Sequence, residues 1–328
     1  MEFLVVFLVM LAKVIFLTLI LFILPIPLTW MERKVAGHIQ QRLGPMRTGW
    51  HGLLQPVADG IKLMTKEDII PDQADRLLFK LAPLLSLAPP FAVFVAIPFG
   101  EPITIFGTQV NLYLSDMNVG LLYILGVGGL EIYGVIFGGW ASNNKYALLG
   151  SFRTCAQLIS YAVPMGFAVI GVIMLAESMN LSQIVIAQEN VWNVVLQPIG
   201  FIVFFIAGLA EAQRIPFDLA EAEGDLVAGY HTEYSGMRFA LFMTSEYVVM
   251  LTISVLCVLL FFGGWNGIWL PLPPVVWFML KVFLFVYLIM WIRFTFPRYR
   301  YDQLMTIGWK VLLPLSLLNI LITGLFFT

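Results

Sequence analysis

Long apolar stretches alternate with shorter polar segments along the whole chain. A transmembrane α-helix needs about 20 mostly apolar residues, and eight stretches are long enough. They cover residues 3–31, 77–99, 118–140, 148–175, 192–212, 239–262, 274–296 and 303–327. The pattern therefore predicts an all-α polytopic membrane protein with about eight transmembrane helices, in a single integral membrane domain over residues 1–328.

The lysines and arginines follow the same alternation. Most of them lie in segments 32–76, 141–153, 213–238 and 293–302, whereas segments 100–117, 176–191 and 263–273 contain none. Because the cytoplasmic loops of membrane proteins are enriched in Lys and Arg, the first four segments are predicted to be inside loops and both termini to lie outside. The apolar N-terminal stretch has no obvious cleavage site of small residues, so a retained span is expected rather than a signal peptide.

The overall composition narrows the possible functions. Hydrophobic residues make up 60% of the chain and charged residues 12%, which excludes an ordinary soluble domain. A net charge of -2 lacks the basic excess of a nucleic-acid-binding protein. The two cysteines, Cys155 and Cys257, are too few for the four thiolates that usually hold an iron–sulfur cluster. Any electron carrier is therefore expected on another chain, and no metal site is expected on this one.

The first inside loop contains a short amphipathic stretch from His51 to Lys66. One helical face of this stretch is apolar and the opposite face is polar; the members are Leu53, Leu54, Val57, Ile61 and Met64 on the first, and Gln55, Asp59, Lys62 and Lys66 on the second. A helix of this kind can lie in the plane of the membrane interface. One interpretation is a plain surface helix. The other is one wall of a lateral opening for an amphipathic ligand, whose polar headgroup would contact Asp59 and Arg33.

Several carboxylates lie within or next to the predicted membrane spans, where charged side chains are unfavourable. The segment between the fifth and sixth apolar stretches and its flanks contain seven, namely Glu211, Asp218, Glu221, Glu223, Asp225, Glu233 and Glu246. Glu131 lies inside the third stretch, and each charge at mid-bilayer costs about 2.5–3.5 kcal/mol. Such acids usually mark a path for ions or protons. The alternative is structural pairing that involves Lys281 and Lys310, and Lys13 has no assigned partner.

Several sequence motifs occur together over nearly the whole chain. They are Met31–Gly37 with Gln41–Pro45, Gln55–Leu63 followed by Lys66–Asp68, Gly139–Tyr146, Pro216–Glu223 with Gly229–His231 and Glu233–Met237, and Pro297–Met305 with Gly308–Lys310. In combination they are highly specific. The chain resembles the H-type membrane subunits of the proton-translocating NADH-quinone oxidoreductases, which are the bacterial counterparts of subunit 1 of mitochondrial complex I.

The resemblance implies a protein of the bacterial cytoplasmic (inner) membrane that has no redox centre of its own. Its partners would be peripheral iron–sulfur and quinone-site subunits, small membrane subunits and antiporter-like subunits, with NAD, FMN and the iron–sulfur clusters bound by those partners. Quinone, the substrate, would meet Glu32, Arg33, Arg42 and Asp59 of this chain. The residues implied in the proton path or its coupling are Glu131, Glu211, Arg214, Asp218, Glu221, Glu223, Asp225, Glu233 and Glu246.

The chain departs from the family pattern at a few positions. The family usually has a glutamate directly after Ser-Tyr in the fourth span, but Ser160-Tyr161 is followed by Ala162. A proton path through that position is broken or rerouted, and Glu131 is the proposed substitute. Met46 replaces an asparagine of the family's first inside loop, and Asp225 stands where a glutamate is expected.

Two other functions stay open at this point. The chain could be the membrane subunit of a related energy-converting hydrogenase, or of a ferredoxin- or F420-linked complex, although the match around Glu32-Arg33-Lys34 and Asp59 favours the quinone-using branch. A stand-alone proton-coupled transporter would also explain intramembrane acids. It would not explain why the inside loops carry most of the polar residues, as a docking surface would.

Overall fold

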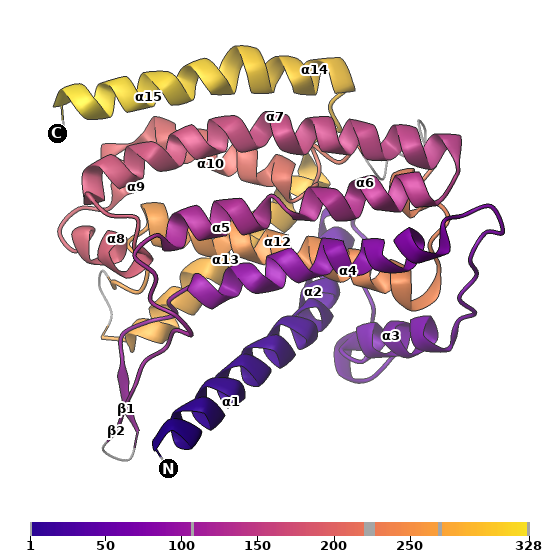
Figure 1. Ribbon diagram of the computed structural model, residues 1–328, viewed down its shortest axis with the longest axis horizontal. Coiled ribbons are helices and arrows are strands. Elements are labelled where there is room, and N and C mark those ends of the chain that lie inside the picture. Colours follow the sequence, from indigo (N-terminus) through magenta and orange to yellow (C-terminus); the bar gives the residue numbers. More distant parts are fainter. Residues whose placement is uncertain (1, 106–107, 220–226, 268–270, 327–328) are drawn as a thin grey trace.

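The computed structural model describes residues 2–105, 108–219, 227–267 and 271–326, and their regular structure is almost entirely helical (Figure 1). The first half contains α1 Glu2–Ile23, α2 Pro25–Ile39, η1 Trp50–Gly52, α3 Gln55–Thr65, α4 Arg76–Val93, η2 Phe94–Ala96, β1 Ile103–Ile105, β2 Thr108–Val110, α5 Gly120–Gly128 and α6 Glu131–Ala141. The second half contains α7 Lys145–Ala176, α8 Leu181–Ala187, α9 Asn193–Leu196, α10 Pro198–Glu211, η3 Gly229–His231, α12 Gly236–Phe261, α13 Pro274–Thr295, α14 Tyr301–Thr306, the π-helix η4 Ile307–Leu312 and α15 Leu313–Phe326.

Seven helical segments in the described part of the chain are long and apolar enough to cross a membrane. They are Phe7–Ile39, Arg76–Ala96, Gly120–Ala141, Lys145–Ala176, Gly236–Phe261, Pro274–Thr295 and Tyr301–Phe326, and the shorter apolar helix Pro198–Glu211 lies beside them. The expectation of an all-α polytopic membrane protein is confirmed. The antiparallel β1–β2 hairpin is a minor addition, with Ile103 opposite Val110.

Two of the differences from the predicted boundaries bear on the candidate site, and proline explains one of them. The stretch 192–212 was expected to be one span, but it is divided into α9 and α10 at Pro198. Pro198 lacks a backbone N–H and fits the first turn of α10, where that donor is not needed. The other difference is at the first inside loop, because α2 continues to Ile39 instead of ending at residue 31. Glu32 and Arg33 are therefore successive residues of a helix.

Helix α12 lies at the centre of the bundle, where α4, α7, α10 and α13 surround it (Figure 1). Almost every side chain from Ser245 to Phe261 is buried. A helix that is buried on all sides is usually apolar on all sides, so the few polar side chains of α12 are exceptions. Glu246 is one of them, and it is buried because it lies on this central helix rather than in a loop.

The polar connections gather at the two ends of the bundle. Helix α3 and the α6–α7 connection lie at one end, whereas the β1–β2 hairpin, α8 and the C-terminus lie toward the other (Figure 1). Lys13 Nζ donates a hydrogen bond to Asn111 O at 3.0 Å, which ties α1 to the segment after β2. The partner of Lys13 that the sequence left open is therefore a backbone carbonyl.

Candidate functional site

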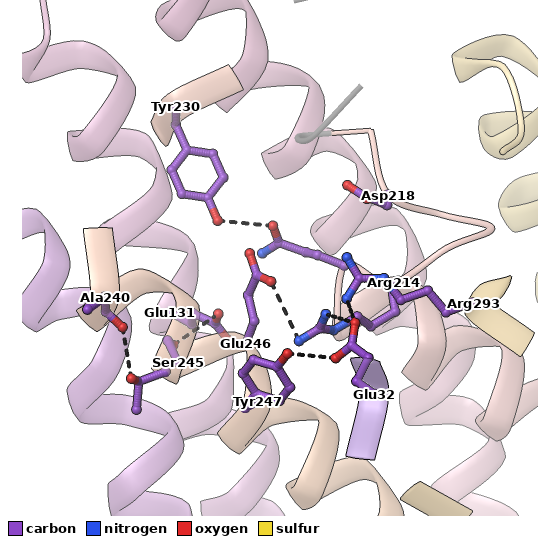
Figure 2. A network of polar contacts seen from close by, with 12 residues as sticks. Glu32, Glu131, Arg214, Asp218, Tyr230, Ala240, Ser245, Glu246, Tyr247 and Arg293 are labelled. Carbon is purple, nitrogen blue, oxygen red and sulfur yellow. Dashed lines mark hydrogen bonds and ion pairs between the residues drawn. The ribbon is translucent and has the colours of Figure 1, made fainter. Parts of the chain in front are cut away.

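A cluster of charged groups is buried where α2, α12, α13 and the segment after α10 meet (Figure 2). Glu32 of α2 accepts hydrogen bonds from Tyr247 Oη, at 2.6 Å, and from Arg293 Nη1. Arg214 lies 3.8 Å from Glu32 Oε1 and 3.8 Å from Glu246 Oε2. A buried carboxylate is stable when cations and hydrogen-bond donors compensate it, and Glu32 has both.

Arg214 connects the two acids of this cluster because it is held between helices. Its guanidinium lies over the ring of Tyr247, with Cζ 4.5 Å from the ring centre. The side chain of Arg214 is nearly inaccessible to water, at 4% exposure. Its charge is therefore directed at Glu32 on one side and Glu246 on the other, and a change of charge at either acid acts on the same guanidinium.

A second group of acids surrounds a small cavity deeper in the bundle. Glu131, the first residue of α6, and Glu211, the last residue of α10, both line it, together with Pro90, Met165 and Thr252. About 30 Å³ of this cavity is open to the centres of water molecules, which is room for one or two. Oε2 of Glu211 is buried and has no hydrogen-bond partner among the described residues. A water molecule in the cavity is the obvious donor.

The two acid groups are linked by α12. Glu246 contacts Arg214, whereas its neighbour Ser245 lies 3.5 Å from Glu131 Oε1 (Figure 2). The negative charges of Glu211 and Glu246 both act on Glu131. Successive residues of one buried helix therefore contact Arg214 of the ion-paired cluster and Glu131, an acid that lines the water-sized cavity.

The predicted quinone-binding residues form two separate pairs of contacts. Arg33 Nη1 lies 2.5 Å from Asp59 Oδ2 and joins α2 to α3. Burial raises the pKa of Asp59, but the hydrogen bond and charge of Arg33 outweigh it and leave the pKa below its usual value. Glu32 points into the bundle instead, and the exposed Arg42 bonds Gln40. The structure thus joins Arg33 to Asp59, joins Glu32 through Arg214 to Glu246, one of the acids predicted for the proton path, and keeps Arg42 apart.

The acidic segment after α10 is only partly described. Asp218 pairs with Arg298 at 3.1 Å, and Glu233 accepts a hydrogen bond from Asn144 at 2.7 Å. Glu221, Glu223 and Asp225 lie outside the described residues. His231 is buried among Tyr230, Phe239 and Phe242, where the described residues offer neither ring nitrogen a partner, and burial lowers its pKa to about 3.

Ala162 and Glu131 lie in different environments. Ala162 is exposed on the surface of α7, whereas Glu131 is 6% exposed and faces the interior. A glutamate at position 162 would point out of the bundle, toward lipid or a neighbouring chain. Glu131 is therefore a buried acid with its own surroundings and does not occupy the space of the glutamate that the family usually has after Ser-Tyr.

Sequence reasoning missed several members of the buried network, notably Tyr247, Arg293 and Ser245. Tyr247 and Ser245 flank Glu246 in the sequence, and that position was their only signal. Arg293 was counted among the inside basic residues, but its pairing with Glu32 brings together positions 261 residues apart. Among the described residues, no group of three His, Cys, Asp or Glu side chains is arranged to hold a metal ion.

The comparisons with known proteins concern the chain as a whole. The sequence profile of the NADH dehydrogenase family matches residues 11–324. The chain is 73% identical over 316 residues to the second H-type NADH-quinone oxidoreductase subunit of Rhizobium meliloti, a match that covers 96% of each chain. The chain belongs to the family of H-type subunits of NADH-quinone oxidoreductases.

Other members of this family show how widely the likeness extends. The second H-type subunit of Rhizobium etli is 72% identical over 324 residues, covering 99% of this chain and 95% of the relative. The first H-type subunit of Geobacter metallireducens is 52% identical over 314 residues, covering 96% and 95%. The resemblance inferred from the motifs is confirmed, and the chain is a multi-pass integral membrane protein.

Proposed function

We propose that this chain helps to form the quinone chamber of a proton-translocating NADH:quinone oxidoreductase and couples quinone reduction to proton translocation. The observation that carries the proposal is the buried polar network from Glu32 through Arg214 to Glu246, continued by Ser245 to Glu131. Charges at this depth are rare in membrane proteins and usually functional. Membership of the family indicates the reaction, and the buried network is the proposed route that couples this reaction to proton transfer.

The quinone side of the proposal rests on α2 and α3. Arg33 and Asp59 are partly exposed, with side-chain exposures of 47% and 26%, so their polar atoms are accessible to a headgroup. The apolar side chains Leu54, Ile61 and Met64 of α3 and its N-terminal flank are exposed beside them and suit the plane of the membrane interface. The pair Arg33–Asp59 would guide a quinone headgroup toward the chamber, and the apolar face of α3 would follow its tail.

The proton side rests on charge coupling. Quinone reduction takes up two protons and leaves transient negative charge near Glu32. Because Arg214 is shared by Glu32 and Glu246, that charge changes how strongly Arg214 attracts Glu246. The strength of the repulsion between Glu246 and Glu131 then changes as well. Proton exchange through the cavity between Glu131 and Glu211 would pass this change on to antiporter-like subunits.

The proposal places the chain in the bacterial inner membrane with both termini outside. The electron carriers NADH, FMN and iron–sulfur clusters would be bound by partner subunits. These partners would dock at the α3 and α6–α7 end of the bundle, which carries the predicted inside loops.

The test is the ratio of protons pumped to NADH oxidised by the whole complex in liposomes. Glu131→Gln keeps the shape of the side chain and removes its proton, so the ratio is expected to fall by roughly fivefold or more, as for a lost coupling between sites. Glu189→Gln is the matched control, because Glu189 is exposed at the opposite end of the bundle. A Glu131→Gln complex that pumps at the full ratio would contradict this role.

A further inference from the structure

Three backbone carbonyls of α4, those of Phe79, Leu85 and Ser86, lose their usual donor because of proline. In an α-helix the C=O of residue i accepts from the N–H of residue i+4, and proline has no N–H. Pro83 therefore frees the carbonyl of Phe79, and Pro90 frees that of Ser86. Pro89 also removes the alternative i+3 donor from Ser86. The carbonyl of Ser86 thus lacks both the α and the 3₁₀ donor.

The carbonyls of Phe79 and Ser86 each accept a hydrogen bond from a hydroxyl group near or within α12. Tyr234 Oη donates to Phe79 O at 3.3 Å, and Ser245 Oγ donates to Ser86 O at 2.7 Å. Ser86 and Ser245 are 2% and 0% exposed, so no bulk water reaches this contact. The hydroxyl of Ser245 replaces the missing backbone donor of α4, which is how membrane helices usually tolerate internal proline.

Ser245 has a second possible acceptor. Glu131 Oε1 lies 3.5 Å from its Oγ, and Ser86 Oγ lies 3.4 Å away on the donor side. The close approach of α6 to α4 sets this arrangement, because a Cβ at Gly134 would lie 2.4 Å from Ser86 N. Gly134 is one turn after Glu131, so the same contact brings the Glu131 end of α6 close to Ser86.

A serine hydroxyl has one hydrogen to donate. When Glu131 is protonated, its O–H can donate to Ser245 Oγ while Ser245 donates to Ser86 O, and every group is satisfied. When Glu131 is ionised, it needs a donor, and a hydrogen bond to a charged acceptor is stronger than one to a neutral carbonyl. Ser245 then serves Glu131 and leaves Ser86 O without its donor.

We propose that Ser245 is a positioning residue that couples the charge of Glu131 to the proline break in α4 by donating alternately to Glu131 and Ser86. The inference rests on the proposed role of Glu131 in proton transfer. Pro90 also lines the cavity between Glu131 and Glu211. A shift of α4 at Pro90 therefore changes the space in which a water molecule would carry the proton onward.

The charges that face Glu131 come from two helices. Glu211 of α10 lies across the cavity, and Glu246 of α12 adjoins Ser245. The residues that α4, α5 and α7 contribute to the cavity lining are uncharged. Within the described part of the chain, the hydrogen-bond donor to Glu131 is Ser245 itself, which is why its hydroxyl responds to the charge of Glu131.

The experiment uses the whole complex and measures two quantities, the ratio of protons pumped to NADH oxidised and the midpoint of thermal inactivation. Ser245→Ala is expected to lower the ratio by roughly fivefold, the lower end of coupling between sites. Ser245→Thr keeps the hydroxyl and should retain the ratio. Ser254→Ala is the matched control, because Ser254 is equally buried in α12 but donates within its own helix, to Met250 O.

A second pair of variants tests the link to proline. Pro90→Ala returns the N–H that Ser86 O lacks, so Ser245 loses its alternation and the ratio falls as in Ser245→Ala. In the Pro90→Ala background, Ser245→Ala should not lower the ratio further. Additive losses in the double variant would overturn the inference, and so would a Ser245→Ala complex that is less stable but pumps at the normal ratio.

Glu131→Gln separates this inference from the proposed function. If Glu131→Gln lowers the ratio and Ser245→Ala does not, the proton role of Glu131 stands and the Ser245 inference fails. If Glu131→Gln leaves the ratio unchanged, the proposed role of Glu131 fails, and the inference fails with it. The proposed function and the inference are both supported if Glu131→Gln and Ser245→Ala each lower the ratio, and if the losses caused by Pro90→Ala and Ser245→Ala are not additive.

Discussion

Two groups of buried acids differ in what compensates their charge. Glu32 is surrounded by Arg214, Arg293 and the Tyr247 hydroxyl, whereas Glu131 and Glu211 share a water-sized cavity with no cation among its described lining residues. The first group can stay ionised because its partners balance the charge. Among the described residues, Ser245 is the hydrogen-bond donor to the second group, and a water molecule in the cavity or a proton would relieve the rest of its charge. The difference suggests that one group senses charge and the other moves protons.

The largest effect on stability is expected from replacing Glu32, the acid that is paired with Arg214 and Arg293. Glu32→Gln takes one counterion from the buried Arg214 and the partly buried Arg293, and loss of one partner from a buried pair destabilises by about 3–5 kcal/mol. Glu211→Gln takes no counterion from a cation among the described residues and should destabilise far less. The amount of assembled complex and its thermal inactivation midpoint measure both. Equal destabilisation by the two variants would remove the distinction between the groups.

The proton-transfer half of the comparison is tested by pumping. Glu211→Gln should lower the ratio of protons pumped to NADH oxidised, because the cavity then has an amide where it had an exchangeable carboxyl proton. Glu189→Gln again serves as the control. A Glu211→Gln complex that keeps its full pumping ratio would place Glu211 with the structural acids instead.

A third region, around His231, lies outside the membrane spans and is expected to lose stability at low pH. His231 is buried and neutral, and burial lowers its pKa to about 3, below the value of about 6.5 for an unfolded chain. The unfolded chain therefore binds a proton first as pH falls below about 6.5, and stability is lost from there downward. The loss by pH 5 should be about 2 kcal/mol.

His231→Phe is the variant that tests this contribution, because a phenyl ring fits the aromatic surroundings of Tyr230, Phe239 and Phe242. Its thermal inactivation midpoint should fall less between pH 7 and pH 5 than that of the parent complex. Between pH 7 and pH 8 the two slopes should agree, since His231 is neutral in both states there. Identical slopes below pH 7 would show that His231 is protonated or solvated in the complex.

The smallest effect on stability is expected at the half-exposed pair. Asp59→Asn removes the charge partner of Arg33, and ion pairs with this exposure contribute about 0–1 kcal/mol. If the pair guides the quinone headgroup, the variant should raise the KM for quinone while the thermal inactivation midpoint hardly changes. A normal KM would separate Asp59 from quinone binding.

The sequence predicted the spans well because their signal is local. Twenty apolar residues in a row identify a membrane helix without knowledge of its neighbours, and the segments around α4, α7 and α13 were placed correctly. The division at Pro198 and the extension of α2 to Ile39 were missed. Both depend on whether a helix continues through polar or proline residues, and hydrophobicity alone does not decide that.

The candidate site was predicted in kind but not in arrangement. The acids Glu131, Glu211 and Glu246 were identified because charge is unusual within an apolar stretch. Their partners were not, because Arg293 and Tyr247 look ordinary in the sequence and reach Glu32 across 261 and 215 residues. The motifs indicated the family, which the comparisons confirmed, but the assignment of individual residues to quinone or protons stays a prediction.

The sequence by itself determined that the chain crosses the membrane repeatedly, that carboxylates are placed at membrane depth, and to which family it belongs. These properties follow from residue types and their order. Only the tertiary structure decided which acids are paired, which line a cavity, and that Ser245 stands between Glu131 and the carbonyl freed by Pro90. The reason is that compensation of a buried charge depends on distances of a few ångströms between helices that the sequence separates widely.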